Sequence, residues 1–195
     1  MLISICATPA ARLPGQVRID VTAGARYTTR LVHDRIVTPF DVRAGLAPAL
    51  SLSASLPLDP PWRLAGVLDV STSNVARYDA GGGTAPITGL TTVSLGLGLA
   101  RPLKPWLDGR LVLGAIKYFP ADRVGLFQDG GPFFPFGQLT FDAAPPFAAR
   151  QGLALELRYD IHKFTTSALR AEGFISSQVI HRLALGVRVA VRRAP

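Results

Sequence analysis

The stretch Val179–Arg193, VIHRLALGVRVAVRR, alternates apolar residues with charged or small ones. From Leu183 to Val191, valine or leucine stands at every second position, and Arg182 and Arg188 share the other phase. A period of two indicates a β-strand, because successive side chains of a strand point to opposite faces. Two environments satisfy this pattern. Either the arginines meet outside water around an apolar core, or they line a polar interior while the valines meet lipid.

The composition favours a single all-β domain and argues against nucleic acid as a partner. The chain has 195 residues, of which 48% are hydrophobic, with 19 glycines and 16 prolines punctuating short apolar segments. Its net charge of +8 suits anionic lipid, lipopolysaccharide phosphate or nucleic acid. The arginines, however, are scattered along the predicted strands and form no basic patch with interleaved aromatic residues.

The N-terminal segment and the cysteine count set further limits. Residues 1–15, MLISICATPAARLPG, are expected to be a signal remnant or a disordered tail, which leaves residues 16–195 for the folded domain. Cys6 is the only cysteine of the sequence, so neither an internal disulfide nor a cysteine metal site is predicted. No apolar run reaches 18 residues, which argues against a transmembrane helix. We expect no metal and no cofactor.

The alternation of the opening stretch recurs along the chain. Eight segments carry it: Val17–Tyr27, Val42–Leu56, Trp62–Ser73, Thr91–Ala100, Leu107–Phe119, Phe134–Phe141, Gly152–Phe164 and Val179–Arg193. The sixth, Phe134–Phe141, is weaker, because it alternates only near Leu139 and Phe141. An even number of strands suits antiparallel closure into a barrel.

The connections between these segments alternate in length. The first, third, fifth and seventh are long, whereas the second (PLDPP), fourth (RPLKP) and sixth (AAPPFAAR) are short and marked by proline. Outer-membrane barrels have long loops outside the cell and tight turns in the periplasm. The whole of Val17–Arg193 therefore resembles the small eight-stranded outer-membrane β-barrels, the broad group of outer-membrane proteins A, X and W and the opacity-type adhesins. The resemblance implies an antiparallel up-and-down transmembrane barrel in the outer membrane. One departure is Val191, which stands where such barrels usually end in an aromatic residue.

Strand length, aromatic placement and the glycines of the polar phase support this interpretation over a soluble, lipocalin-like ligand-binding barrel with inverted faces. Several segments exceed the 9–11 residues that cross the hydrocarbon core at a tilt. Aromatic residues at the strand ends are predicted to form interfacial girdles, although Phe164 falls on the polar phase. The predicted girdle comprises Tyr27, Trp62, Trp106, Phe119, Tyr159 and Phe164.

The polar face would then line a narrow lumen, where arginines are tolerable only if they are paired. We predict that the interior is filled by an ion-pair network and bound water. Its predicted members are Asp20, Arg26, Arg43, Asp69, Asp108, Arg110, Glu156, Arg158, Asp160, Arg182 and Arg188. A structural plug is favoured over a path for ions or small solutes, because eight strands leave little open bore.

The sequence gives little support for catalysis. Some outer-membrane barrels act on lipid A, and the deacylases among them place a serine two residues from a histidine on one strand. None of His33, His162 and His181 is followed by serine at that spacing. We expect a non-enzymatic outer-membrane protein with a structural or surface-interaction role. Its expected partners are membrane lipid, lipopolysaccharide and an extracellular or periplasmic protein, and the alternatives are a narrow channel and a soluble ligand-binding barrel.

Overall fold

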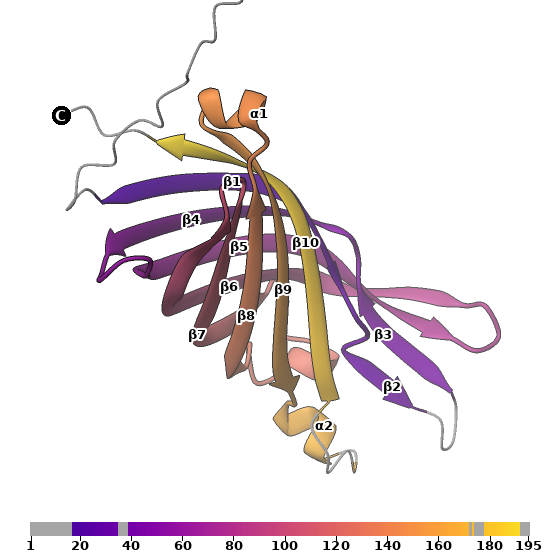
Figure 1. Ribbon diagram of the computed structural model, residues 1–195. Coiled ribbons are helices and arrows are strands. Elements are labelled where there is room, and N and C mark those ends of the chain that lie inside the picture. Colours follow the sequence, from indigo (N-terminus) through magenta and orange to yellow (C-terminus); the bar gives the residue numbers. More distant parts are fainter. Residues whose placement is uncertain (1–16, 35–38, 172, 174–177, 192–195) are drawn as a thin grey trace, which may run out of the picture.

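The protein is built almost entirely of antiparallel β-strands. The computed structural model describes residues 17–34, 39–171, 173 and 178–191, so the predicted tail at 1–15 lies outside the described residues. The strands of the described part are β1 (Arg18–Thr28), β2 (Val32–Asp34), β3 (Phe40–Ala44), β4 (Ala47–Pro57), β5 (Arg63–Asp79), β6 (Thr84–Lys104), β7 (Leu107–Pro120), β8 (Phe133–Ala143), β9 (Leu153–Phe164) and β10 (Gln178–Val191) (Figure 1).

Eight of the described strands close into a ring. Neighbours along the chain pair with one another from β4 to β10, and β1 pairs with both β4 and β10. The ring order β1-β4-β5-β6-β7-β8-β9-β10 confirms the predicted eight-stranded up-and-down barrel. Closure leaves the ring without a free edge, which is what a sheet needs in a medium that offers no hydrogen bonds.

The predicted strand Val42–Leu56 is interrupted by a one-residue bulge. Its two parts, β3 and β4, both pair with β5, but Ala44 is opposite Val75 whereas Ala49 is opposite Ser71. One extra residue therefore lies on the β3–β4 side, at Gly45–Leu46. Because side chains alternate with a period of two, this bulge exchanges the two faces of the strand.

The third connection, which we expected to be a long loop over residues 74–90, is a strand hairpin instead. β5 and β6 continue pairing as far as Tyr78 and Thr84, and the glycine-rich stretch AGGGTAP supplies its turn. Together with β2 and β3 this hairpin projects beyond the ring at one end of the barrel (Figure 1). We call this the loop end; the 3-10 helix η1 (Gly125–Phe127) and the short helix α2 (Ser167–Ala171) also lie there.

Short connections occupy the opposite end, which we call the turn end. They are the turns between β4 and β5 and between β6 and β7, and the short helix α1 (Pro146–Arg150) between β8 and β9. In the part of the chain that the structure describes, no helix has the length and apolar character needed to cross a membrane.

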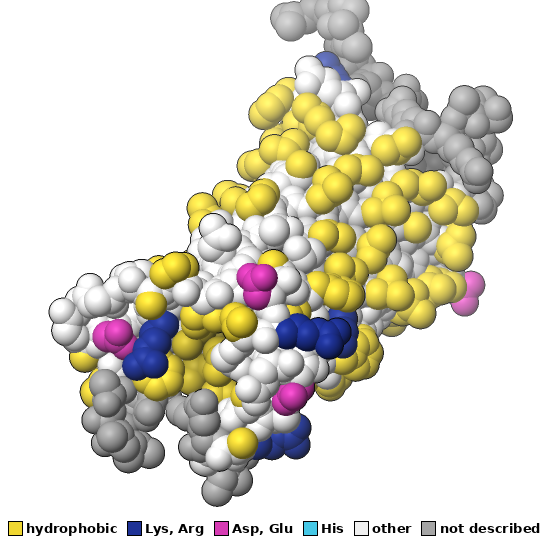
Figure 2. All heavy atoms as spheres, turned by 180° about the vertical axis from the view of Figure 1, so that it is seen from behind, with side chains coloured by type: hydrophobic (Ala, Val, Ile, Leu, Met, Phe, Trp, Pro, Cys, Tyr) yellow, Lys and Arg dark blue, Asp and Glu magenta, His cyan; other side chains and the backbone are white. Residues whose placement is uncertain are grey.

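The apolar phase of the ring strands faces outward. Leu97, Leu113 and Leu185 leave about two thirds of their surface exposed, at 65%, 68% and 61%. Apolar side chains cover the barrel wall toward the turn end in Figure 2, and charged ones gather toward the loop end. Exposed apolar side chains over most of a barrel wall indicate an apolar surrounding medium, since a soluble monomer rarely exposes so large a patch. The polar phase faces inward, which answers the question that the opening stretch raises.

Candidate functional site in the barrel lumen

The lumen contains a continuous series of ion pairs, which we call the charge ladder. It joins six arginines and six carboxylates from β1, β5, β7, β8, β9 and β10. From the loop end toward the turn end its members are Arg182, Asp160, Arg26, Asp69, Arg158, Glu156, Arg110, Asp142, Arg188, Asp20, Arg18 and Asp108.

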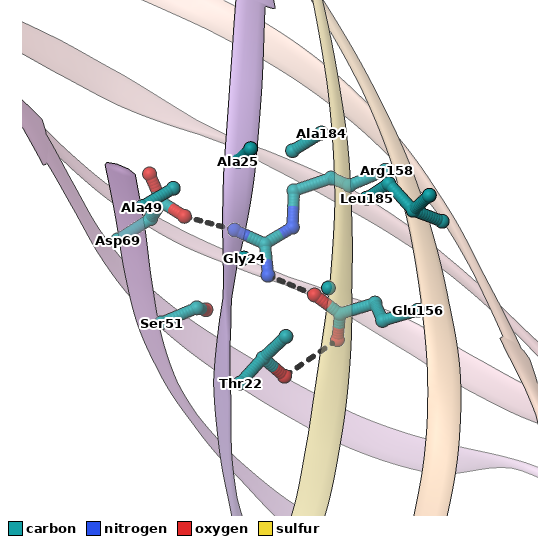
Figure 3. Close-up of a pocket in the computed structure, with 11 residues that line it drawn as sticks. Thr22, Gly24, Ala25, Ala49, Ser51, Asp69, Glu156, Arg158, Ala184 and Leu185 are labelled. Carbon is teal, nitrogen blue, oxygen red and sulfur yellow. Dashed lines mark hydrogen bonds and ion pairs between the residues drawn. The ribbon is translucent and has the colours of Figure 1, made fainter. Parts of the chain in front are cut away.

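Asp69 is the central member of the ladder, and its carboxylate is almost fully buried. One of its oxygens accepts a hydrogen bond from Arg26, and the other accepts one from Arg158. Arg158 lies on β9, and β5, which carries Asp69, is four strands away around the ring, so this ion pair crosses the lumen (Figure 3). Arg26 also donates to Ser71 at 3.0 Å.

Glu156 continues the ladder toward the turn end. Its carboxylate pairs with Arg158 on the same strand and accepts hydrogen bonds from the Thr22 hydroxyl at 3.1 Å and from Arg110 at 3.3 Å. The aligned carboxylates and guanidinium group are visible in Figure 3, where Arg158 lies between Asp69 and Glu156. A buried carboxylate needs such multiple donors, because an unpaired charge in this environment is strongly disfavoured.

Toward the turn end the ladder reaches solvent. Asp142 accepts hydrogen bonds from Arg110 at 3.1 Å and from Arg188 at 2.8 Å. Arg188 lies 4.0 Å from Asp20, which pairs with Arg18 at 2.9 Å. Arg18 in turn lies 3.7 Å from Asp108, and both of these side chains are partly exposed. These groups line a pocket that opens to solvent.

Toward the loop end the ladder ends at Arg182, which pairs with Asp160 at 2.9 Å and donates to Thr92 at 3.3 Å. Above it the interior changes from polar to aromatic. The Tyr118 hydroxyl lies 2.6 Å from His162 Nε2, and the Tyr118 ring packs against Phe164 with ring centroids 5.3 Å apart.

An apolar cluster closes the loop end of the lumen. Phe127 from η1, Leu169 from α2 and Val32 from β2 are buried together with Tyr118 and Phe164. These side chains come from the ring strands and from the connections that cover them. The lumen is therefore closed by apolar packing at the loop end and occupied by paired charges below it.

Ten of the eleven predicted lumen residues belong to the charge ladder, but Arg43 does not. It lies on β3, on the loop-end side of the bulge, so its side chain is on the outer face and 49% exposed. Sequence analysis also missed two members of the ladder. Asp142 lies one residue beyond the predicted strand Phe134–Phe141, and Arg18 lies within the predicted strand Val17–Tyr27 but is not among the predicted network members.

Arg43 instead joins an outward cluster centred on Asp41. The Asp41 carboxylate accepts hydrogen bonds from Arg43 at 2.5 Å and from Arg30 at 3.2 Å, and it lies 2.6 Å from His33 Nδ1. Desolvation alone would raise the pKa of this carboxyl, but the hydrogen bonds from Arg43, His33 and Arg30 outweigh it and lower the pKa to about 2. Asp41 is thus ionised at any physiological pH.

Five residues of the predicted aromatic girdle are exposed, whereas Phe164 is buried, so its assignment to the girdle is wrong. Tyr27, Trp62, Trp106, Phe119 and Tyr159 are all exposed on the outer wall. At the turn end the Arg101 guanidinium lies 5.1 Å from the Trp62 ring, and Lys104 Nζ lies 5.7 Å from the Trp106 ring. Phe164 is fully buried in the apolar cluster, because it follows the inward phase of β9. In the sequence Phe164 alternates in phase with the polar residues of its strand, and this phase indicated that its side chain points inward.

The described residues contain no group of three or more His, Cys, Asp or Glu side chains that could hold a metal ion. The histidines instead contact aromatic or charged groups. His162 contacts Tyr118, and His181 stacks on Tyr159 with its Nδ1 2.6 Å from the tyrosine hydroxyl.

Comparison with known proteins identifies the fold. The chain matches no protein-family model, and no curated protein sequence matches it. Among solved structures it is similar to Ail, the attachment invasion locus protein of Yersinia pestis, in complex with the heparin analogue sucrose octasulfate. That match has a TM-score of 0.52 and 10% identity, and it covers 92% of this chain and 100% of Ail. It is also similar to the outer-membrane protein AlkL in lipid bilayers, with a TM-score of 0.52, 11% identity and coverage of 100% and 99%. The chain thus has the fold of the small outer-membrane β-barrels.

Proposed function

We propose that the protein is a non-conducting, non-enzymatic outer-membrane barrel, which presents its loop-end hairpins at the cell surface for structural or binding roles. The observation that carries the proposal is the charge ladder together with the apolar cluster above it. Side chains from opposite sides of the ring meet inside the barrel, so the lumen serves as a core and not as a conduit. A core of this kind leaves the projecting hairpins as the part of the molecule available to partners.

The exposed aliphatic side chains and the asymmetry of the two ends support the orientation. Barrels in the outer membrane place short turns in the periplasm and longer extensions outside. The turn end, with Trp62 and Trp106 beside cationic side chains, would then lie at the periplasmic interface. The loop end, with the β2–β3 and β5–β6 hairpins, would face the cell exterior.

Two competing functions conflict with particular contacts. A solute channel needs a continuous polar path, but Arg158 and Asp69 meet across the lumen, and Phe127 and Leu169 help to seal the loop end. A soluble ligand-binding barrel needs an apolar interior, whereas Glu156 and Arg110 lie inside and Leu113 lies outside. The fold by itself is compatible with both enzymes and non-enzymes, so the absence of catalysis has to be tested directly.

Refolding and conductance measurements test the proposal. The full chain is refolded in detergent and, separately, in plain buffer, and its gel mobility is compared with and without boiling. We expect a compact, heat-modifiable species in detergent and none in buffer. In planar bilayers this species should show no single-channel steps, and lipid A incubated with it should keep its mass. Regular conductance steps that change on Glu156→Gln would establish a channel instead, and a change in the mass of lipid A would establish an enzyme.

A further inference from the structure

An unassigned cationic cluster lies on the outer face of the loop end. It consists of Arg30, His33, Asp41, Arg43 and Tyr78, contributed by the β1–β2 connection, β2, β3 and β5. It is separate from the charge ladder, because Asp41 and Arg43 belong to the outward phase of β3, whereas Val42 between them is buried in the apolar cluster.

The cluster keeps excess positive charge that is open to solvent. Arg30 and Arg43 share one carboxylate, that of Asp41, so the group carries a net charge of +1 even with His33 neutral. The Arg30 and Arg43 side chains are 48% and 49% exposed, whereas Asp41 is only 14% exposed. The two guanidinium groups therefore remain accessible to an incoming anion while the carboxylate that positions them is covered.

The same contacts hold the two guanidinium groups in fixed positions. One Asp41 oxygen accepts from Arg30 and the other accepts from Arg43. The Arg43 guanidinium also lies over the Tyr78 ring, 5.3 Å from its centroid. Two guanidinium groups that donate to the two oxygens of one carboxylate are close enough for one phosphate to accept from both, because a phosphate accepts hydrogen bonds on several oxygens.

The surroundings of the cluster place it at the boundary of the apolar wall. Leu46, in the bulge between β3 and β4, is 71% exposed, and Tyr27, near the end of β1, is 58% exposed. Apolar and aromatic side chains of this kind contact lipid tails and the interface in a membrane barrel. An anion bound by Arg30 and Arg43 would thus have acyl chains extending along the wall beneath it.

We propose that Arg30 and Arg43 bind the phosphate group of an anionic glycolipid of the outer leaflet. This inference rests on the orientation in the proposed function and deepens it by naming the chemistry of one surface partner. A soluble polyanion is the competing ligand, and the continuity of the site with Leu46 and Tyr27 favours the lipid.

The test measures binding of fluorescent bisphosphorylated lipid A to the full chain refolded in detergent micelles. The double variant Arg30→Gln/Arg43→Gln should weaken binding by at least about tenfold, since each lost charge-assisted hydrogen bond is worth a factor of that order. The matched control Arg77→Gln/Arg123→Gln removes one partly exposed and one exposed charge of the loop end that do not belong to the cluster, and it should change binding less than about twofold. Heat-modifiable gel mobility verifies that every variant is folded.

Several results would overturn the inference. They are the absence of binding to the folded wild-type chain, equal binding of dephosphorylated lipid A, and equal losses in the two double variants. Competition by inorganic phosphate or sucrose octasulfate at concentrations comparable to lipid A would assign the site to a soluble anion and would also refute the lipid. Conductance is measured separately, so a barrel that conducts and still binds lipid A refutes the proposed function but not this site.

Discussion

Replacing Asp69 by asparagine removes the carboxylate that joins Arg26 and Arg158 across the lumen while preserving its volume. Both arginines would stay buried, Arg26 with Asp160 at 3.9 Å and Ser71 at 3.0 Å, and Arg158 with Glu156. Removing one partner of a buried ion pair typically costs 3–5 kcal/mol, because the remaining charge is left uncompensated. Since each arginine keeps a second partner, we expect a loss of about 3 kcal/mol in the free energy of unfolding.

Urea titration of the barrel in lipid vesicles, followed by tryptophan fluorescence and gel mobility, measures this loss. The matched control is Asp79→Asn, which removes the partner of Arg77 from an ion pair whose two side chains are about 40% exposed, at 42% and 39%. That exposed pair should contribute no more than about 1 kcal/mol. If Asp69→Asn and Asp79→Asn reduce the free energy of unfolding equally, the charge ladder does not act as the core of the barrel, and the reasoning fails.

Three further perturbations test the wall, the seam and the outer cluster. Leu97→Arg places a charge on the outer wall and should cost about 2–4 kcal/mol in vesicle unfolding experiments, whereas a water-facing wall would tolerate it. Gly24→Ala would bring its Cβ to 2.1 Å from the Leu185 carbonyl oxygen, so β1 and β10 must separate and the heat-modifiable fraction should fall. The control Gly83→Ala should leave that fraction unchanged, because the atom nearest to its new Cβ is a side-chain oxygen at 3.5 Å. Because folding lowers the pKa of Asp41, the ionised carboxylate stabilises the folded hairpin fully above the ordinary pKa of 3.8, and this stabilisation is lost as the pH falls to about 2. Protease cleavage of the β2–β3 hairpin should therefore rise between these two pH values. Asp41→Asn should abolish this pH dependence.

The barrel was predictable from the sequence because the two faces of its strands meet different media. Alternation over Leu153–Phe164 and Gln178–Val191 continues from one end of the strand to the other, and the structure keeps both phases intact. The same alternation located most of the charge ladder, including Arg158 and Arg182, since charged residues on the inward phase had to meet one another. Pairing partners were not predictable, because they depend on the register of strands that are distant in sequence.

The prediction errors arise where alternation in the sequence no longer indicates which face of the barrel wall a side chain occupies. The bulge at Gly45–Leu46 exchanges the faces of the strand without any marked change in composition, which is why Arg43 was assigned to the lumen. The hairpin of β5 and β6 extends past the wall, where both faces need not differ, so residues 74–90 resembled a loop. Phe164 shows the opposite case, in which the phase was informative and the residue type was misleading.

The charge ladder has a consequence for how the barrel is assembled. The contact between Asp69 and Arg158 joins β5 to β9, which are four strands apart in the ring, so it does not exist until the sheet closes. A sheet inserted before β1 meets β10 would expose Asp69 and Arg158 to the membrane without this contact, and an unpaired buried ion costs several kcal/mol. Insertion one hairpin at a time is therefore unfavourable, and we expect the last strand pairing and the neutralisation of the interior to occur as a single cooperative event.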